Sequence, residues 1–296
     1  MNKDSKSKIA AVLMILLQCT LYGFGDPISK EAYETVPVFS LLTMRYSVAF
    51  IVLMLIFGKK VIETVKTHSV KSWILPCVCI SFTYLCNNIA LSLTAATSVA
   101  FICSMAVVIT PLMSLIFFRE RPQSVQIVIL AFVLVGLYLL CGHGGLNGFG
   151  AGEIFALIAA TCMAGSLVFA KRTVSSIEPI ALTTLQAGVS AVFAFIAALV
   201  IGGGIDVSNV TPKITAIILY LGIACTLLGF LLQNSALKSI SAGTVATLQC
   251  FYPVSTAIWA FVLLGERLSF AGVVGCAIIL VCVILAGTIG TKASDV

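Results

Sequence analysis

Arg45 is the residue whose position most directly suggests chemistry. It stands in the middle of the apolar run LLTMRYSVAF, residues 41–50, in a chain of which only 9% of the residues are charged. An arginine at the centre of a membrane-spanning helix costs ~2.5–3.5 kcal/mol on insertion scales, so it must face protein or water. A guanidinium can bind a carboxylate bidentately. Arg45 is therefore our first candidate ligand-binding residue.

Three polar residues of the preceding apolar run share one helix face, because Gln18, Tyr22 and Asp26 are spaced by four. Asp26 lies at a depth similar to that of Arg45. We expect this face and Arg45 to line the outer part of a cavity, in which Asp26 can pair with Arg45. The alternative is a static salt bridge that joins the first two spans. Proton coupling through Asp26 stays open.

Side-chain amides and aromatic rings provide further candidates. Amides in hydrocarbon need partners, worth roughly 0.6–2 kcal/mol each, and they either join helices or contact a substrate. A stripe of amphipathic residues spaced i, i+3, i+7 and i+10 surrounds Pro253. Such stripes usually pack against other helices, but the proline removes a backbone hydrogen bond, and irregular backbone at membrane depth favours a cavity lining. These candidates are the amides Asn87, Asn88, Gln233 and Asn234, and the stripe Gln249, Tyr252, Thr256 and Trp259.

The composition requires a membrane environment for these residues. Of the 296 residues, 60% are hydrophobic, and the mean hydropathy is +1.15. A soluble domain is about half apolar and about a quarter charged, so that class is excluded. Runs of ~20 apolar residues, long enough to cross a bilayer, predict an all-α integral membrane protein with ten transmembrane helices. The predicted spans are 9–28, 37–57, 73–93, 95–118, 125–141, 152–170, 180–201, 214–236, 242–264 and 270–289.

Lysine and arginine are distributed unevenly between the links. With the N-terminus inside, thirteen of the 17 lie in inner segments, three lie in outer segments, and Arg45 lies within a span. Basic residues concentrate on the cytoplasmic side of membrane proteins. We therefore predict a multi-pass protein of the cell membrane with both termini cytoplasmic. The same bias explains the net charge of +6 without a nucleic-acid partner.

The sequence contains an internal repeat. NNIALSLTAATSVA at 87–100 aligns with QNSALKSISAGTVA at 233–246, and the same offset of 146 aligns Glu120 with Glu266. Upstream, an offset of 141 aligns Arg45 with Gln186, which makes Gln186 a further candidate. We predict two five-helix units, 9–141 and 152–290, joined by an outer linker, 142–151. Because five is odd, the second unit is inverted, as is typical of transporters.

These motifs resemble the drug/metabolite transporter superfamily, and within it the EamA-type ten-helix exporters. The resemblance covers essentially the whole chain. It is carried by the Ala-Leu-x-x-x-x-Ala entry to the fourth and ninth spans, by Pro253 in CFYPV, and by Leu-Gly-Glu-Arg at 264–267. It implies an inner-membrane carrier built as two EamA units around a central cavity. The first unit departs from the pattern, because Pro111 lies four residues nearer its glutamate than Pro253 does.

We expect a secondary transporter that exports a small polar or amphipathic metabolite by alternating access. The candidate residues suit an amino acid, since they could bind its carboxylate and its ammonium group. The alternatives are a flippase component, a membrane sensor or an intramembrane enzyme, although no HExxH, GxSxG or phosphate-loop motif is present. We expect no cofactor, metal site or disulfide. The expected partners are a small molecule and the lipid bilayer, and the protein is a monomer or a homodimer.

Overall fold

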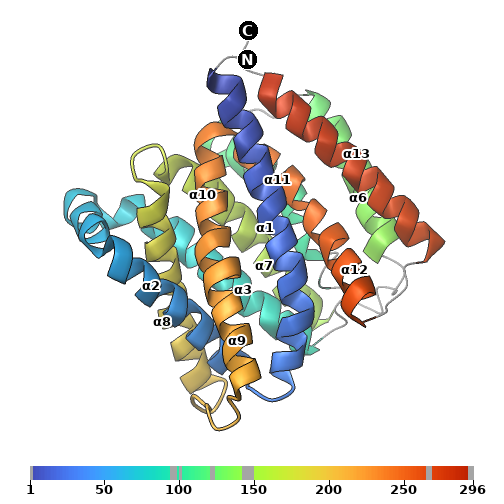
Figure 1. The fold of residues 1–296 in the computed structure, drawn as a ribbon. Coiled ribbons are helices and arrows are strands. Elements are labelled where there is room, and N and C mark those ends of the chain that lie inside the picture. Colours follow the sequence, from blue (N-terminus) through green and yellow to red (C-terminus); the bar gives the residue numbers. More distant parts are fainter. Residues whose placement is uncertain are drawn as a thin grey trace.

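The computed structural model describes residues 3–93, 99, 102–120, 124–141, 150–264 and 269–292, and these form helices joined by short connections, without a strand. The all-α class is confirmed (Figure 1). The helices are α1 (Lys3–Tyr33), α2 (Val38–Thr67), the 3-10 turn η1 (Val70–Ser72), α3 (Ile74–Leu93), α5 (Ala106–Phe118), α6 (Ser124–Cys141), α7 (Ala151–Thr173), α8 (Pro179–Val200), α9 (Pro212–Tyr220), the π-helical segment η3 (Leu221–Leu228), α10 (Gly229–Ser239), α11 (Ala242–Gln249), α12 (Phe251–Leu264) and α13 (Phe270–Lys292).

Six helical segments are long and apolar enough to cross a membrane. They are Lys6–Tyr33, Val38–Thr67, Ala151–Thr173, Pro179–Val200, Pro212–Ser239 and Phe270–Thr288. Shorter apolar helices cover Ile74–Ala90, Ala106–Phe118 and Ser124–Leu140. The remaining predicted span, 242–264, is divided between α11 and α12. The architecture of many apolar helices is therefore established, and the count of ten spans stays a prediction.

Helix α2 extends well beyond its predicted span. It continues to Thr67, whereas we predicted that a link begins at residue 58. In the added turns, the hydroxyls of Thr64 and Thr67 donate to the carbonyls of Lys60 and Glu63, each four residues earlier. The predicted boundary was wrong because hydropathy falls at residue 58, while a helix satisfies its own backbone hydrogen bonds and can continue into water beyond the apolar run.

Backbone breaks occur at equivalent places in the two halves. Cys250 forms a turn between α11 and α12, and Ser104, which lies 146 residues earlier, forms a turn before α5. The amides of Cys250 and Val107 both bond carbonyls three residues back rather than four. We expected the loosening at Pro253 itself, and the break lies three residues before it. The proline ring at 253 crowds the carbonyl at 249, which explains this displacement.

Helices of the two halves exchange partners in a two-fold manner. α1 packs against α10 and α12, and the equivalent α7 packs against α3 and α5. α2 packs against α8 and α6 packs against α13, so each of these meets its own counterpart. The start of α1 and the end of α13 lie at the same end of the molecule (Figure 1). We call this the terminal end and the opposite one the far end.

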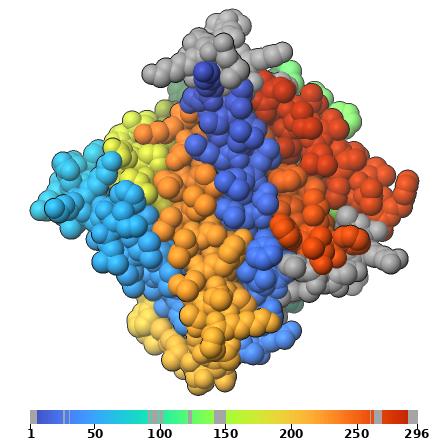
Figure 2. Space-filling view, in the orientation of Figure 1, coloured from blue at the N-terminus to red at the C-terminus, as the bar shows by residue number. Residues whose placement is uncertain are grey.

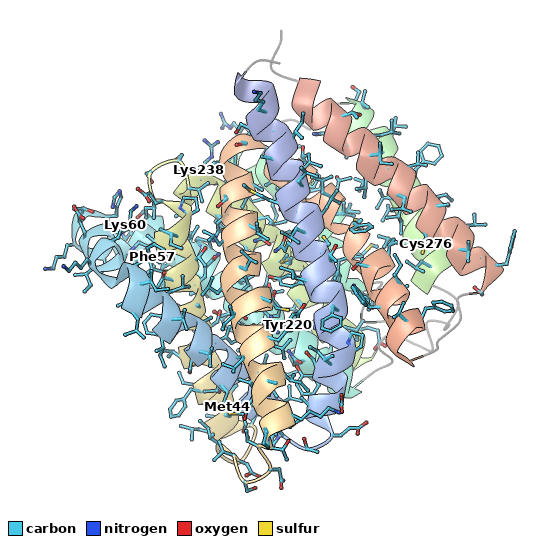
Figure 3. All side chains as sticks on the ribbon, viewed as in Figure 1. Met44, Phe57, Lys60, Tyr220, Lys238 and Cys276 are labelled. Atoms are coloured by element: carbon cyan, nitrogen blue, oxygen red, sulfur yellow. The ribbon has the colours of Figure 1, made fainter. Side chains whose placement is uncertain are left out.

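Helix α1 and the α9–α10 span lie side by side along the face seen in Figure 2. Gly229 allows their close approach, because a Cβ at that position would lie 2.6 Å from Cε1 of Tyr22. Farther along the same contact, the hydroxyl of Tyr220, labelled in Figure 3, donates to the carbonyl of Leu21 at 3.0 Å. This contact places Tyr22 and its neighbours in the centre of the bundle.

Candidate functional site

Three glutamines from three helices form a hydrogen-bonded cluster, which we call the glutamine cluster. Gln18 comes from α1, Gln233 from α10 and Gln249 from α11. The Oε1 atom of Gln233 accepts from Nε2 of Gln18 at 3.0 Å and from Nε2 of Gln249 at 2.8 Å. Nε2 of Gln249 also lies 3.2 Å from Oε1 of Gln18. Gln18 and Gln233 are buried, and Gln249 is half-buried, so the cluster connects the two halves in the interior.

Arg45 is buried in the bundle and bonded to the π-helical segment. Its side chain is 8% exposed, and its Nε donates to Oγ1 of Thr226 at 2.7 Å. The Thr226 hydroxyl in turn donates to the carbonyl of Leu221, five residues earlier, which is the π-helical spacing. None of the carboxylates whose side chains are described pairs with Arg45. The expected pairing with Asp26 lies outside the described residues, because only the backbone of Asp26 is described.

Aromatic rings surround the Arg45 guanidinium. Its Cζ lies 5.5 Å from the ring centroid of Tyr46 and 5.6 Å from that of Tyr84, within the range of a cation–π contact. Phe230 packs on both rings, with centroids 6.5 Å from Tyr46 and 6.0 Å from Tyr84. We call Tyr46, Tyr84 and Phe230 the aromatic group. Desolvation by these rings strengthens any electrostatic interaction of the guanidinium.

Tyr22 connects the glutamine cluster to the neighbourhood of Arg45. Nε2 of Gln18 lies 3.4 Å from the Tyr22 hydroxyl. Tyr22 also lies close enough to Tyr84 and Arg45 to interact with them electrostatically. On its other side, Tyr22 contacts Tyr252 edge-on, with ring centroids 6.4 Å apart. Gln18, Tyr22 and Arg45 therefore belong to one continuous polar region, although Gln18 itself bonds glutamines rather than Arg45.

The other candidate amides lie in separate contacts. Asn234 donates through Nδ2 to Oε1 of Gln186 at 2.7 Å and to Oγ1 of Thr183 at 3.0 Å. We call Gln186 and Asn234 the amide pair. Asn88 accepts from the Tyr33 hydroxyl at 3.3 Å and donates to the carbonyl of Tyr84 at 2.8 Å. Thr183, Gln186 and Asn234 are fully enclosed by protein.

Two further candidates lie apart from Arg45 and the glutamine cluster. Oδ1 of Asn87 lies 3.2 Å from the Sγ of Cys103. Trp259 packs edge-on against Phe24, with ring centroids 5.0 Å apart, and Phe24 also contacts Tyr220. This second aromatic contact joins α1, α9 and α12. The predicted stripe from Gln249 to Trp259 is thus divided between different neighbours, because the turn at Cys250 interrupts it.

Thr226, Tyr46 and Tyr84 are site residues that were absent from our predictions. Tyr84 could have been found, since it lies one helical turn before Asn88 and therefore on the same face. Tyr46 adjoins Arg45 in the sequence but resembles an ordinary core residue. Thr226 carries no signal of its own, because its position depends on the π-helical register of η3. A local sequence pattern does not report that register.

The Arg45 side chain is enclosed in this structure, since it is 8% exposed. A hollow of about 450 Å³ lies at the far end between Glu34, Thr35 and the segment 208–211. It does not reach Arg45 or the glutamine cluster. Ion pairs join helices at both ends, Arg172 with Glu120 at 2.9 Å and Lys213 with Glu31. A ligand would therefore reach Arg45 only after helices move apart.

Comparison with known proteins gives a consistent result. The EamA-like transporter family matches residues 9–142 and 150–288. An uncharacterized transporter of Archaeoglobus fulgidus is 24% identical over 66% of this chain and 68% of its own length. Another, from Clostridium kluyveri, is 25% identical over 68% of this chain and 66% of its own. The uncharacterized transporter YetK of Bacillus subtilis is 25% identical over 93% of this chain and 86% of its own.

One solved crystal structure resembles this fold over nearly its whole length. It superposes with a TM-score of 0.79 and covers 98% of this chain and 99% of that chain, at 17% sequence identity. At that identity the likeness establishes the fold alone. The two family matches fall on the two halves that exchange helix partners in the structure.

Proposed function

Because the chain belongs to the EamA-like transporter family, we propose that it is a secondary carrier that exports a small polar or amphipathic metabolite, with amino acids as the favoured class. The family and the many apolar helices make it a multi-pass membrane protein. The proposal goes beyond membership of the family by naming a substrate class, a direction of transport and a mechanism. It also places the protein in the cell membrane with both termini in the cytoplasm, on the strength of the lysine and arginine bias.

The environment of Arg45 is the observation that carries the substrate class. Its Nε is occupied by Thr226, while the two terminal nitrogens have no described carboxylate partner. Those nitrogens form the edge that binds a carboxylate bidentately. The Tyr46 hydroxyl beside it is buried and has no described hydrogen-bond partner, so its oxygen can accept from an ammonium group. An amino acid carries both of these groups on one carbon.

The two-fold exchange of helix partners supports an alternating-access mechanism. If the ten predicted spans form two inverted five-helix units, rocking one unit against the other opens the far end and the terminal end in turn. The turns at Ser104 and Cys250 lie at equivalent positions and interrupt the helices where such rocking would bend them. The closed site around Arg45 then corresponds to an occluded state between the two openings.

Transport by proteoliposomes tests this proposal. Labelled leucine, phenylalanine and threonine would be offered separately to vesicles containing the wild-type protein, Arg45→Gln or Arg172→Gln, with and without a pH gradient. The two variants make the same chemical change, but Arg172 is a half-exposed surface residue. We expect Arg45→Gln to raise the half-saturation constant by about 10- to 100-fold, the value of a hydrogen bond to a charged group.

Two results would contradict the proposal. If Arg45→Gln and Arg172→Gln transport the same compound with the same constants as the wild-type protein, Arg45 does not contact the substrate. If none of the amino acids moves while a fluorescent lipid analogue crosses the bilayer, the protein is a flippase component. A pH gradient that changes the rate would assign proton coupling, for which Asp26→Asn is the first variant to examine.

A further inference from the structure

Two equivalent residues of the repeat meet at the centre of the molecule. The offset of 146 places Tyr84 of α3 opposite Phe230 of α10, and their ring centroids lie 6.0 Å apart with an interplanar angle of 30°. Residues related by a two-fold axis can contact each other only close to that axis. The Tyr84–Phe230 contact therefore marks the pseudo-two-fold axis between the halves.

Arg45 and Gln186 lie on opposite sides of this axis. They are equivalent under the offset of 141, and each is seven residues from the first residue of its helix, Val38 in α2 and Pro179 in α8. α2 begins near the far end, where Met44 is labelled in Figure 3, and α8 begins near the terminal end. Both residues are therefore about 10 Å along their helices from opposite ends.

Gln186 and Asn234 have hydrogen-bonding atoms without partners. Nε2 of Gln186 and Oδ1 of Asn234 are buried, and neither bonds any described atom. The two amides bond each other once. If both amides were turned around, that bond would reverse, and one donor and one acceptor would still remain. The amide pair thus presents a buried donor beside a buried acceptor, which is unusual because buried polar atoms are nearly always paired.

We propose that the amide pair is a second substrate station, on the terminal side of the Tyr84–Phe230 contact, which binds the same carboxylate and ammonium groups that Arg45 and its rings bind on the far side. This inference rests on the proposed function. The free donor of Gln186 suits a carboxylate oxygen, and the free acceptor of Asn234 suits an ammonium N–H. Asn234 follows Phe230 by one turn of α10, so the station adjoins the aromatic group directly.

The two stations differ in strength. A neutral amide holds a carboxylate more weakly than a guanidinium does. Substrate can therefore exchange readily with water at the terminal end and bind more firmly after it passes the aromatic group. The competing role for the amide pair is purely structural, in which it joins α8 to α10. The two roles differ in what the same substitution does to transport, because only a substrate station changes the half-saturation constant at one face.

The double variant Gln186→Met with Asn234→Leu separates these roles. It replaces both amides by apolar side chains of similar size, which is neutral or stabilising when the amides carry unpaired atoms. Ser190→Ala is the control, since Ser190 lies one turn farther along α8 and bonds Ser81 at 2.9 Å, outside the station. Melting in detergent would be measured for each protein, together with uptake of labelled leucine, phenylalanine and threonine.

Everted and right-side-out membrane vesicles give access to the two faces separately. For the double variant we expect an unchanged or raised melting temperature. We also expect a half-saturation constant about tenfold higher at the cytoplasmic face and changed less than threefold at the outer face. Arg45→Gln should show the reverse asymmetry, and Ser190→Ala should show none.

Four outcomes would overturn the inference. A lower melting temperature with wild-type constants at both faces would show that the amide pair only joins helices. Equal increases at both faces would show a general effect on the carrier and no station on one side. A wild-type protein that moves none of the three amino acids would refute the proposed function, and the station would fall with it. If the wild-type protein transports an amino acid and the double variant transports it with the same constants, the station is refuted and the proposed function is not.

Discussion

Nε of Arg45 donates at 2.7 Å to Oγ1 of Thr226, a hydroxyl that is itself bonded to the backbone of the π-helical segment η3. The orientation of the guanidinium is thus set by a backbone irregularity in the other half of the chain. Because the hydroxyl donates its one hydrogen to the carbonyl of Leu221, it can only accept from Arg45. Thr226 therefore fixes the direction in which Arg45 presents its terminal nitrogens.

Thr226→Val should destabilise the protein by about 1.5–3 kcal/mol, the cost of removing a hydrogen bond to a buried charged group. Valine has the shape of threonine without the hydroxyl, so the loss reflects the bond and not the packing. Thermal unfolding in detergent would measure it. Thr226→Ser keeps the hydroxyl and is the matched control. Equal melting temperatures for the valine and serine variants would show that the bond contributes nothing to stability.

Gly229→Ala should destabilise the contact between α1 and α10. The added Cβ would lie 2.6 Å from Cε1 and 2.8 Å from the hydroxyl oxygen of Tyr22, and overpacking of this kind costs about 1–3 kcal/mol. Gly243→Ala in α11 is the control, because its nearest neighbours lie at 3.9 and 4.0 Å. Alanine at that helical position should be neutral or raise stability by up to about 1 kcal/mol. A stable Gly229→Ala variant would mean that Tyr22 moves without cost.

Gln233→Leu should be more damaging than Gln249→Leu. Oε1 of Gln233 is the acceptor shared by the other two members of the glutamine cluster, and its loss leaves the buried donor of Gln18 and the half-buried donor of Gln249 short of a partner. We expect about 1–3 kcal/mol of destabilisation. Gln249 is half-buried, so water can replace its contacts. Chemical unfolding of the two variants side by side gives the comparison, and the reverse order would rule out Gln233 as the centre of the cluster.

Tags at the two termini should be accessible from the same side of the membrane. The start of α1 and the end of α13 lie at one end of the molecule, and we propose from the lysine and arginine bias that this end is cytoplasmic. A membrane-impermeant reagent should therefore label a tag before Met1 and a tag after Val296 only when cells are permeabilised. Labelling of one tag on intact cells would contradict the shared side, and labelling of both would reverse the orientation.

The internal repeat and the helices could be predicted from the sequence because they depend on local composition and on matches at a fixed offset. Arg45 could be singled out because a charge in an apolar span is costly wherever it lies. Partners could not be predicted in the same way. Gln18 bonds Gln233, which is 215 residues away, and the spacing of Gln18, Tyr22 and Asp26 indicates a shared face without indicating what that face meets.

Boundaries and irregularities were predicted less well, each for a physical reason. Hydropathy indicates where the hydrocarbon of the membrane ends, not where the helix ends. We therefore predicted a limit at residue 57, whereas α2 continues to Thr67. The proline at 253 indicated a disturbed helix, but the break settled at Cys250, and its counterpart at Ser104 lies seven residues before Pro111. The π-helical segment contains Gly222 and precedes Gly229, but glycines also occur in the regular apolar helices of this chain, so they do not mark the π-helical register.

The π-helical register of η3 has a consequence for the whole eighth span. A single turn of this kind adds about one residue to the helical path, which rotates everything after it by roughly 100°. The isoleucines of α9, Ile214 and Ile217, pack into one cluster, whereas Gln233 and Asn234 of α10 turn toward different neighbours. A deletion of one residue between 221 and 228 would restore a regular helix. It would rotate Gln233 and Asn234 together, by roughly 100° about the helix axis, away from their present partners. The π-helical turn thus rotates α10 relative to α9 about the helix axis. This rotation allows one continuous helix to make the α9 contacts on one side and the α10 amide contacts on another.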